Sequence, residues 1–286
     1  MVGLDTVESA PLAHGQRDSE GLSDLVAAMR ARLGLVALLL LLAGLAWWVT
    51  VNQMAGMDAG PGTDLGAVGW FIGVWVVMMA AMMFPSIAPT VALYARMTRL
   101  RSPVRPLLFA AAYLVVWAAV GLLSYGLFEL GKNWFGSQLA WNAGGRWFTA
   151  AVLAAAAIYE LTPLKNVCLS KCRSPLGFLL GNWREGEAGA VEMGSRHAAW
   201  CVGCCWALMA ALFALGVMSL VWMAVVAALI TAEKTIPWRR PVVWSTTVIL
   251  LVLAVMVAAD PHAVPGLVVP GSAGGAASDM GMMPKP

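Results

Sequence analysis

The chain has 286 residues, of which 60% are hydrophobic and only 12% are charged, and its mean hydropathy is +0.78. Soluble domains contain about 45–50% apolar and about 25% charged residues, so this composition excludes an ordinary water-soluble enzyme. The formal net charge of +3 is too small to indicate a nucleic-acid partner. The sequence instead predicts a polytopic membrane protein that lies in a lipid bilayer.

Seven membrane-spanning helices are predicted in chain order. Residues 1–32 are polar and lack the apolar segment and cleavage site of a signal peptide, so we expect a flexible extension before the first span. The apolar stretch from His197 to Thr235 is too long for one span, and we expect a break near Gly216–Ser219. The predicted spans cover residues 33–51, 67–95, 107–130, 146–164, 197–215, 219–236 and 242–259.

The distribution of basic residues predicts the orientation of these spans. Cytoplasmic segments of membrane proteins carry an excess of lysine and arginine. With the N-terminus in the cytoplasm, seven spans place fifteen of the eighteen lysines and arginines on that side. These are Arg17, Arg30, Arg32, Arg96, Arg99, Arg101, Arg105, Lys165, Lys171, Arg173, Arg184, Arg196, Lys234, Arg239 and Arg240. We therefore expect an all-α transmembrane bundle in the inner membrane, with the C-terminus on the opposite side.

This topology divides the chain into three regions. A polar cytoplasmic extension covers residues 1–32, and a transmembrane helical domain covers residues 33–260. Within that domain, the polar stretch 165–196 forms a cytoplasmic loop that contains cysteines. The segment 261–286 is rich in Gly, Pro, Ala and Met, a composition that predicts a disordered tail.

The second predicted span contains four methionines in the segment MMAAMM. Residues four apart share a helix face, so the four side chains form two adjacent thioether pairs. The pairs are Met78 with Met82 and Met79 with Met83. Thioethers are soft donors that favour Cu(I), so the motif predicts a copper site within the bilayer. The alternative is that the methionines fill gaps in a helix core.

All five cysteines lie at or near the predicted cytoplasmic face, in two groups. Cys168 and Cys172 follow the fourth span. Cys201, Cys204 and Cys205 begin the fifth span. Two such groups on one membrane face predict either a shared thiolate metal site or disulfide exchange, and the alternative is simple burial. We expect Cys205 to face packing, because it is rotated about 100° from Cys204 on a helix.

Three further side chains are candidates for the site. His197 lies four residues before Cys201 and can add a nitrogen ligand from the same helical face, or it can cap the helix at the membrane boundary. Glu160 and Glu233 lie near the inner ends of predicted spans, where isolated charge in lipid is costly. Each glutamate can function there, or it can simply snorkel or pair with a neighbouring lysine.

A second set of methionines lies on the predicted outer side. A methionine in a solvated segment buries nothing, so capture of a soft cation is a natural explanation for these residues. Chance composition of the tail is the alternative. The outer methionines are Met54 and Met57 in the first loop, and Met280, Met282 and Met283 in the tail.

Three segments in combination resemble a known family. They are MMAAMMFPSIAPTVALY, YELTPLKNVCLSKCRSPLGF and CVGCCWALMAALFALGVMSLVWMAVVAALITAEKTIP. In this order they look like the bacterial family of predicted metal-binding integral membrane proteins, a domain of unknown function, over about residues 65–240. The resemblance implies a membrane location and metal binding by the same methionines and cysteines, but it names no substrate.

The sequence therefore predicts a membrane protein that binds Cu(I) for transport across, or delivery within, the inner membrane. A metallochaperone or a cuproenzyme is the expected partner. The sequence contains no nucleotide-binding or hydrolase motif, so we expect neither an ATP-driven pump nor an enzyme. A transmembrane thiol–disulfide electron carrier would explain the cysteines but not the methionines. A non-catalytic accessory subunit of a membrane complex is the third possibility.

Overall fold

The structure of the chain, a computed structural model, describes residues 12–54, 60–61, 64–98, 104–136 and 141–269. Side chains are described from Leu33 onward within these ranges, except those of Phe135, Asn142 and Ala143. Nine α-helices and no strands form there, which confirms the all-α class. The helices are α1 (Leu12–Met54), α2 (Val68–Met97), α3 (Val104–Phe135), α4 (Arg146–Glu160), α5 (Pro163–Arg173), α6 (Pro175–Gly181), α7 (Gly186–Gly216), α8 (Leu220–Thr235) and α9 (Arg239–Ala259). Two single turns, η1 (Trp141–Gly145) and η2 (Pro261–Ala263), flank α4 and α9.

Each predicted span corresponds to one of these helices. Five of them, α1, α2, α3, α7 and α9, are long and apolar enough to cross a membrane. The remaining two, α4 and α8, have 15 and 16 residues. At 1.5 Å per residue they are shorter than a hydrocarbon core of about 30 Å. The count of seven spans and the direction of the termini remain predictions.

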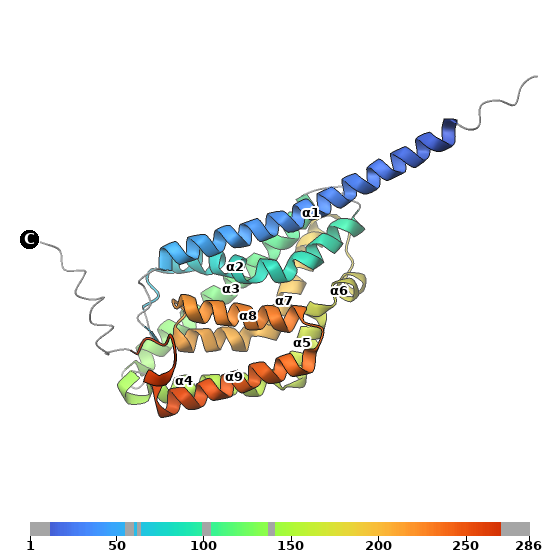
Figure 1. Cartoon of the computed structure of the whole chain (residues 1–286). Coiled ribbons are helices and arrows are strands. Elements are labelled where there is room, and N and C mark those ends of the chain that lie inside the picture. Colours follow the sequence, from blue (N-terminus) through green and yellow to red (C-terminus); the bar gives the residue numbers. More distant parts are fainter. Residues whose placement is uncertain (1–11, 55–59, 62–63, 99–103, 137–140, 270–286) are drawn as a thin grey trace, which may run out of the picture.

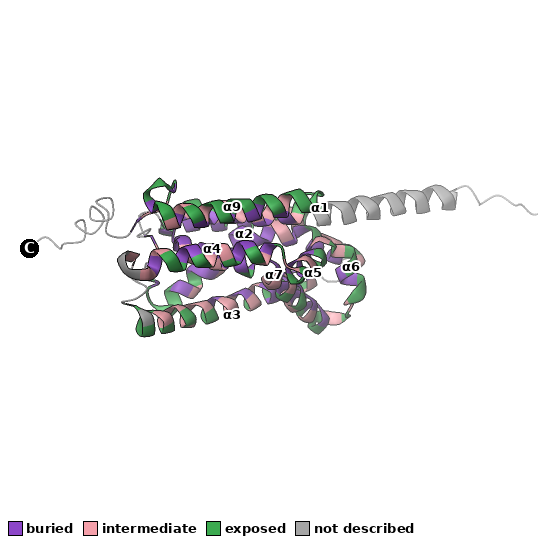
Figure 2. Ribbon diagram, turned by 90° about the horizontal axis from the view of Figure 1, so that it is seen from below, coloured by how far each residue is buried: buried purple, intermediate pink, exposed green. Residues whose placement is uncertain are grey.

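Large apolar side chains on the outside of the bundle indicate a lipid environment. Leu41 of α1 is 71% exposed, Val115 of α3 is 67% exposed and Val255 of α9 is 66% exposed. Figure 2 shows the exposed residues on the outer faces of the helices and the buried ones between the helices. Contiguous exposed apolar surface is unfavourable in water, so these faces are suited to acyl chains.

The helices form pairs that surround a central layer. α1 packs along α2, α3 along α7, and α4 along α9. Figure 1 shows α7 and α8 between the α1–α2 pair and the α4–α9 pair. α7 contacts α3, α4, α5 and α8, so it lies at the centre of the bundle. Residues 201–205, which carry three cysteines, therefore lie in the interior.

The break between α7 and α8 falls where the sequence predicts it. Gly216 ends α7 with φ of +118°, a backbone conformation that glycine adopts without a Cβ clash. Ser219 then precedes the first residue of α8. The turn sends α8 back along α7 and brings Lys234 level with the cysteines in the middle of α7.

A sharp corner replaces the end of the fourth predicted span. α4 ends at Glu160 rather than Leu164, and α5 leaves it at an angle of 67°. Pro163 occupies the first turn of α5, and the Thr162 hydroxyl accepts the backbone N–H of Lys165. Both features favour the start of a new helix over continuation of the old one. The corner places Glu160 and Lys165 beside each other.

Two segments that lie outside the predicted spans are helical. α1 begins at Leu12, so the part of the N-terminal extension that is described is helix. The predicted loop 165–196 contains the rest of α5, all of α6 and the first eleven residues of α7, from Gly186 to Arg196. The cysteines of this region are therefore held on a rigid helix.

Candidate metal centre

Three cysteine side chains from two helices meet in the interior. Cys172 lies on α5, and Cys201 and Cys204 lie on α7. Their three Sγ atoms all lie within 4.8 Å of one another, and all three residues are buried. The Sγ atoms of Cys172 and Cys204 are 3.7 Å apart, which is far longer than a disulfide bond. We call these three residues the sulfur cluster.

Cys205 also borders the sulfur cluster, which differs from the expectation that it faces packing. Its Sγ atom lies 3.7 Å from the Sγ of Cys201 and 3.9 Å from the Sγ of Cys204. The physical reason is the spacing from Cys201: residues four apart share a helix face. The thiols of Cys204 and Cys205 both donate to the carbonyl oxygen of Cys201, at 3.1 and 2.7 Å.

Cys168 lies beside the sulfur cluster rather than within it. A Cβ atom placed on Gly203 would stand 2.7 Å from the Sγ of Cys168, so this thiol faces the α7 backbone at a glycine. All five cysteines are buried and free. The structure thus brings four cysteines together closely and places the fifth against the neighbouring surface of α7.

Met83 of α2 is linked to the cluster through a lysine of α8. The Nζ atom of Lys234 lies 3.0 Å from the Sγ of Cys201 and 3.8 Å from the Sδ of Met83. It also donates to the Ser86 hydroxyl at 3.3 Å. Sequence reasoning missed this contact, because it considered Lys234 only as a partner for Glu233. The signal that could have located it is a lysine in the last turn of a largely apolar helix, where an ionisable side chain needs a partner within the protein.

Each of the four methionines in the MMAAMM segment of α2 is buried, with 0–1% of its surface exposed. Neither of the two thioether pairs therefore faces lipid. Met54 is also buried, at 2%, so it is not the solvated capture residue that the sequence suggested. The other expected outer residues, Met57, Met280, Met282 and Met283, lie outside the described residues.

His197 is packed among aromatic rings. Its ring centroid lies 4.8 Å from that of Phe178 and 5.9 Å from that of Phe109. Its Nδ1 atom has no hydrogen-bond partner among the described residues, and it is not one of the three side chains whose ligand atoms cluster. Tyr113, which sequence reasoning also missed, brings its hydroxyl to 3.0 Å from the Sγ of Cys201.

Glu160 and Glu233 meet at one buried lysine. The Nζ atom of Lys165 pairs with Oε2 of Glu160 and lies 2.7 Å from Oε2 of Glu233. All three side chains are at most 3% exposed. The remaining Oε1 atom of each glutamate has no partner among the described residues. Because two carboxylates share one ammonium, this ionic triad ties α4, α5 and α8 together at one end of the bundle.

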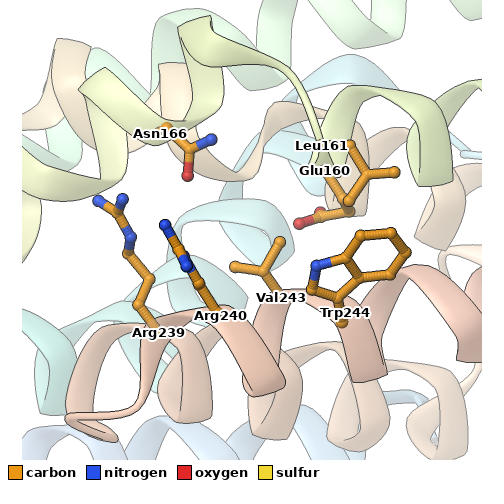
Figure 3. A pocket seen from close by; sticks show the side chains of 7 residues that line it. All are labelled: Glu160, Leu161, Asn166, Arg239, Arg240, Val243 and Trp244. Carbon is orange, nitrogen blue, oxygen red and sulfur yellow. The ribbon is translucent and has the colours of Figure 1, made fainter.

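A cavity of about 320 Å³ opens next to this triad rather than at the sulfur cluster. Figure 3 shows the Glu160 carboxyl and the guanidinium groups of Arg239 and Arg240 directed into it. The other lining residues are Leu161, Asn166, Val243 and Trp244, so within the described part of the chain no sulfur atom faces this space. The cavity gives the ionic triad a polar border, while the sulfur cluster remains enclosed.

The donor chemistry of the centre is soft. Three thiols lie within one coordination sphere, with a fourth thiol and a thioether at its border, and no carboxylate contributes to the group. Thiolates and thioethers select Cu(I), Zn²⁺ or iron–sulfur clusters, whereas Mg²⁺ and Ca²⁺ need oxygen ligands. The enclosed position also excludes water, which would otherwise compete for a bound ion.

Comparison with known proteins identifies a family for this chain. The model of a family described as PpoB2, copper chaperone, matches residues 72–257. This range runs from the first turns of α2 to the last turn of α9, so it contains the sulfur cluster, Met83, Lys234 and the ionic triad. No curated protein and no solved structure matches the chain.

Proposed function

This chain belongs to the PpoB2 copper chaperone family, and from that premise we propose that it holds Cu(I) in the sulfur cluster of Cys172, Cys201 and Cys204. The observation that carries the proposal is the convergence of three buried thiol sulfurs within 4.8 Å. Such a group can close around one ion without a large movement of α5 or α7. Metal binding would release the thiol protons, because the thiolate is the ligand.

The methionine at the border of the cluster favours copper over zinc. Structural zinc sites use cysteine, histidine and carboxylate ligands, whereas a thioether is a ligand for Cu(I). The Sδ of Met83 and the Sγ of Cys201 both contact the ammonium of Lys234, so the thioether lies near the cluster. As a fourth ligand beside the three thiolates, the Met83 thioether would complete the coordination shell of a bound Cu(I).

The other three methionines of the MMAAMM segment place soft donors farther along α2. Met78, Met79 and Met82 are buried in the same helix, and five residues of helix cover about 7.5 Å. In our proposal they offer the ion successive thioether contacts within the bilayer. Transport across the inner membrane, or delivery within it to a metallochaperone or cuproenzyme, would both use this arrangement.

Copper binding by the purified full-length protein tests the proposal. We expect about one Cu(I) per chain, with a clear loss in Cys172→Ser, Cys201→Ser and Cys204→Ser. Cys168→Ser is the matched control, because this thiol lies outside the three-sulfur group. Binding that is absent from the parent protein, or equally affected by all four substitutions, would contradict the proposal.

A thiol–disulfide carrier is the second candidate. The Sγ atoms of Cys172 and Cys204 are 3.7 Å apart on two different helices, so a bond between them needs only a small approach. The bond would form with loss of two electrons and two protons to a quinone or disulfide acceptor. A count of free thiols before and after reduction separates the two functions, because copper binding predicts five free thiols in both samples.

A further inference from the structure

The ammonium of Lys234 is directed into the sulfur cluster by three contacts. An ammonium has three N–H donors. The Sγ of Cys201, the Ser86 hydroxyl and the Sδ of Met83 lie 3.0, 3.3 and 3.8 Å from Nζ. These acceptors come from α7 and α2, while the lysine comes from α8. Three helices therefore fix one positive charge at the edge of the proposed metal site.

This charge is not neutralised by a carboxylate. The neighbouring residue on α8, Glu233, is bound to Lys165 in the ionic triad. Among the described residues, no acidic side chain forms an ion pair with Lys234. The side chain is half-buried between α2, α7 and α8, where charge interactions are stronger than in bulk water. A cation that binds in the sulfur cluster therefore lies close to this ammonium and is repelled by it.

We propose that Lys234 sets the charge selectivity of the sulfur cluster and favours a monovalent soft cation over a divalent one. This inference rests on the proposed function. Coulomb repulsion is proportional to the charge of the incoming ion, so Lys234 disfavours Zn²⁺ twice as strongly as Cu(I). The direction of this preference does not depend on how many thiols are deprotonated, because both ions meet the same thiolates.

The same geometry explains how a site made of thiols can discriminate against zinc. Thiolates alone bind both ions well. A fixed ammonium adds a penalty that grows with ion charge, and its N–H groups can still donate to a thiolate sulfur after Cu(I) is bound. Ser86 holds the ammonium in place, so the charge cannot swing away without losing an acceptor.

The test is the ratio of Zn²⁺ affinity to Cu(I) affinity in purified full-length protein, measured by competition with chelators of known affinity. Lys234→Leu removes the charge and adds no donor atom to the site, and we expect the ratio to rise by about tenfold or more. Lys234→Gln is a second neutral variant, which keeps a donor for Ser86. Lys234→Arg keeps the charge and should retain the parent ratio.

The ratio is chosen because a general loss of site integrity would lower both affinities together. Lys171→Leu, at an exposed lysine of α5, is the matched control and should leave the ratio unchanged. If the parent protein binds Cu(I) and both neutral variants keep its ratio, the selectivity role of Lys234 is wrong and the copper site stands. If the parent protein binds no Cu(I), the proposed function itself fails.

Discussion

Gly203 of α7 faces the thiol of Cys168 so closely that a Cβ atom on the glycine would lie 2.7 Å from Sγ. The same atom would lie 3.4 Å from the Cβ of Cys168. A glycine at this point lets α5 approach α7 near the sulfur cluster. The hydroxyl of Tyr159 donates to the Gly203 carbonyl oxygen, so α4 contacts the same turn. Gly203 thus holds three helices together next to the proposed metal site.

Gly203→Ala should therefore lower the thermal stability of the purified protein and displace Cys168. Contacts below 3.0 Å force a shift, and overpacking of this kind costs about 1–3 kcal/mol. Gly73→Ala is the matched control, because a Cβ atom at Gly73 meets nothing within 4 Å. Equal melting temperatures for the two variants would show that Cys168 does not pack against α7. Thermal unfolding of both variants in one detergent gives the comparison.

Lys165→Met should destabilise the bundle strongly, because it leaves the carboxyls of Glu160 and Glu233 buried without their shared cation. Removing one partner of a buried ion pair typically costs about 3–5 kcal/mol. Lys171→Met on the same helix is the control, since Lys171 is exposed and should change stability little. The measurement is the melting temperature of each variant.

A triple variant separates charge from packing in this triad. Glu160→Gln and Glu233→Gln, added to Lys165→Met, remove all three charges and keep the volumes similar. Replacing a whole buried ion pair with neutral groups is often nearly neutral for stability. The triple variant should therefore melt above Lys165→Met alone. If it melts lower, the loss in the single variant comes from packing and hydrogen bonds rather than unpaired charge.

Asp64 and Lys132 join the segment before α2 to the end of α3 at the surface. The carboxylate accepts the backbone N–H of Gly66 at 2.9 Å and the Nζ of Lys132 at 3.3 Å. The Gly66 hydrogen bond, followed by Lys132, lowers the pKa of Asp64 from its ordinary value of 3.8. A lowered carboxyl pKa contributes stability above the unfolded value, and this contribution is lost as pH falls through the folded value.

Asp64→Asn should therefore lower the melting temperature slightly at neutral pH, and the difference from the parent should close as pH falls below 3.8. The effect is small because the pair is exposed and screened by solvent. Melting temperatures of both proteins across this pH range give the measurement. A difference that stays constant into acid would mean that the Asp64 charge contributes nothing and that the substitution acts through the backbone turn.

The helices follow from local sequence properties, which is why most of the fold could be predicted. Apolar length locates α2, α3 and α9, and the glycine at position 216 interrupts an apolar stretch that is too long for one span. The corner after Glu160 was missed because the apolar pattern continues to Leu164. Thr162 and Pro163 carry the signal for a new helix there, and hydropathy does not register it.

The composition of the metal centre depends on tertiary contacts and could be predicted only in part. Spacing within α7 correctly groups Cys201 with Cys204. Cys205 lies four residues after Cys201 and therefore shares its helix face as well. Its position relative to Cys204 alone does not reveal this. Lys234 is 151 positions from Met83 and reaches it only because α8 turns back beside α2. Local periodicity carries no information about such a contact.

The last prediction separates the methionine at the cluster from the methionines along α2. Met83 and Met78 are both fully buried, but only Met83 shares the Lys234 ammonium with Cys201 among the contacts of the described residues. Leucine is close to methionine in volume and costs less than about 1.5 kcal/mol in a core, yet it has no donor atom. Met83→Leu should therefore fold normally and bind Cu(I) on the order of tenfold more weakly. Met78→Leu should keep the parent affinity, with both variants compared by competition against a Cu(I) chelator. Equal affinities for the two variants and the parent would reduce the methionines of α2 to packing residues and leave the thiols as the whole site.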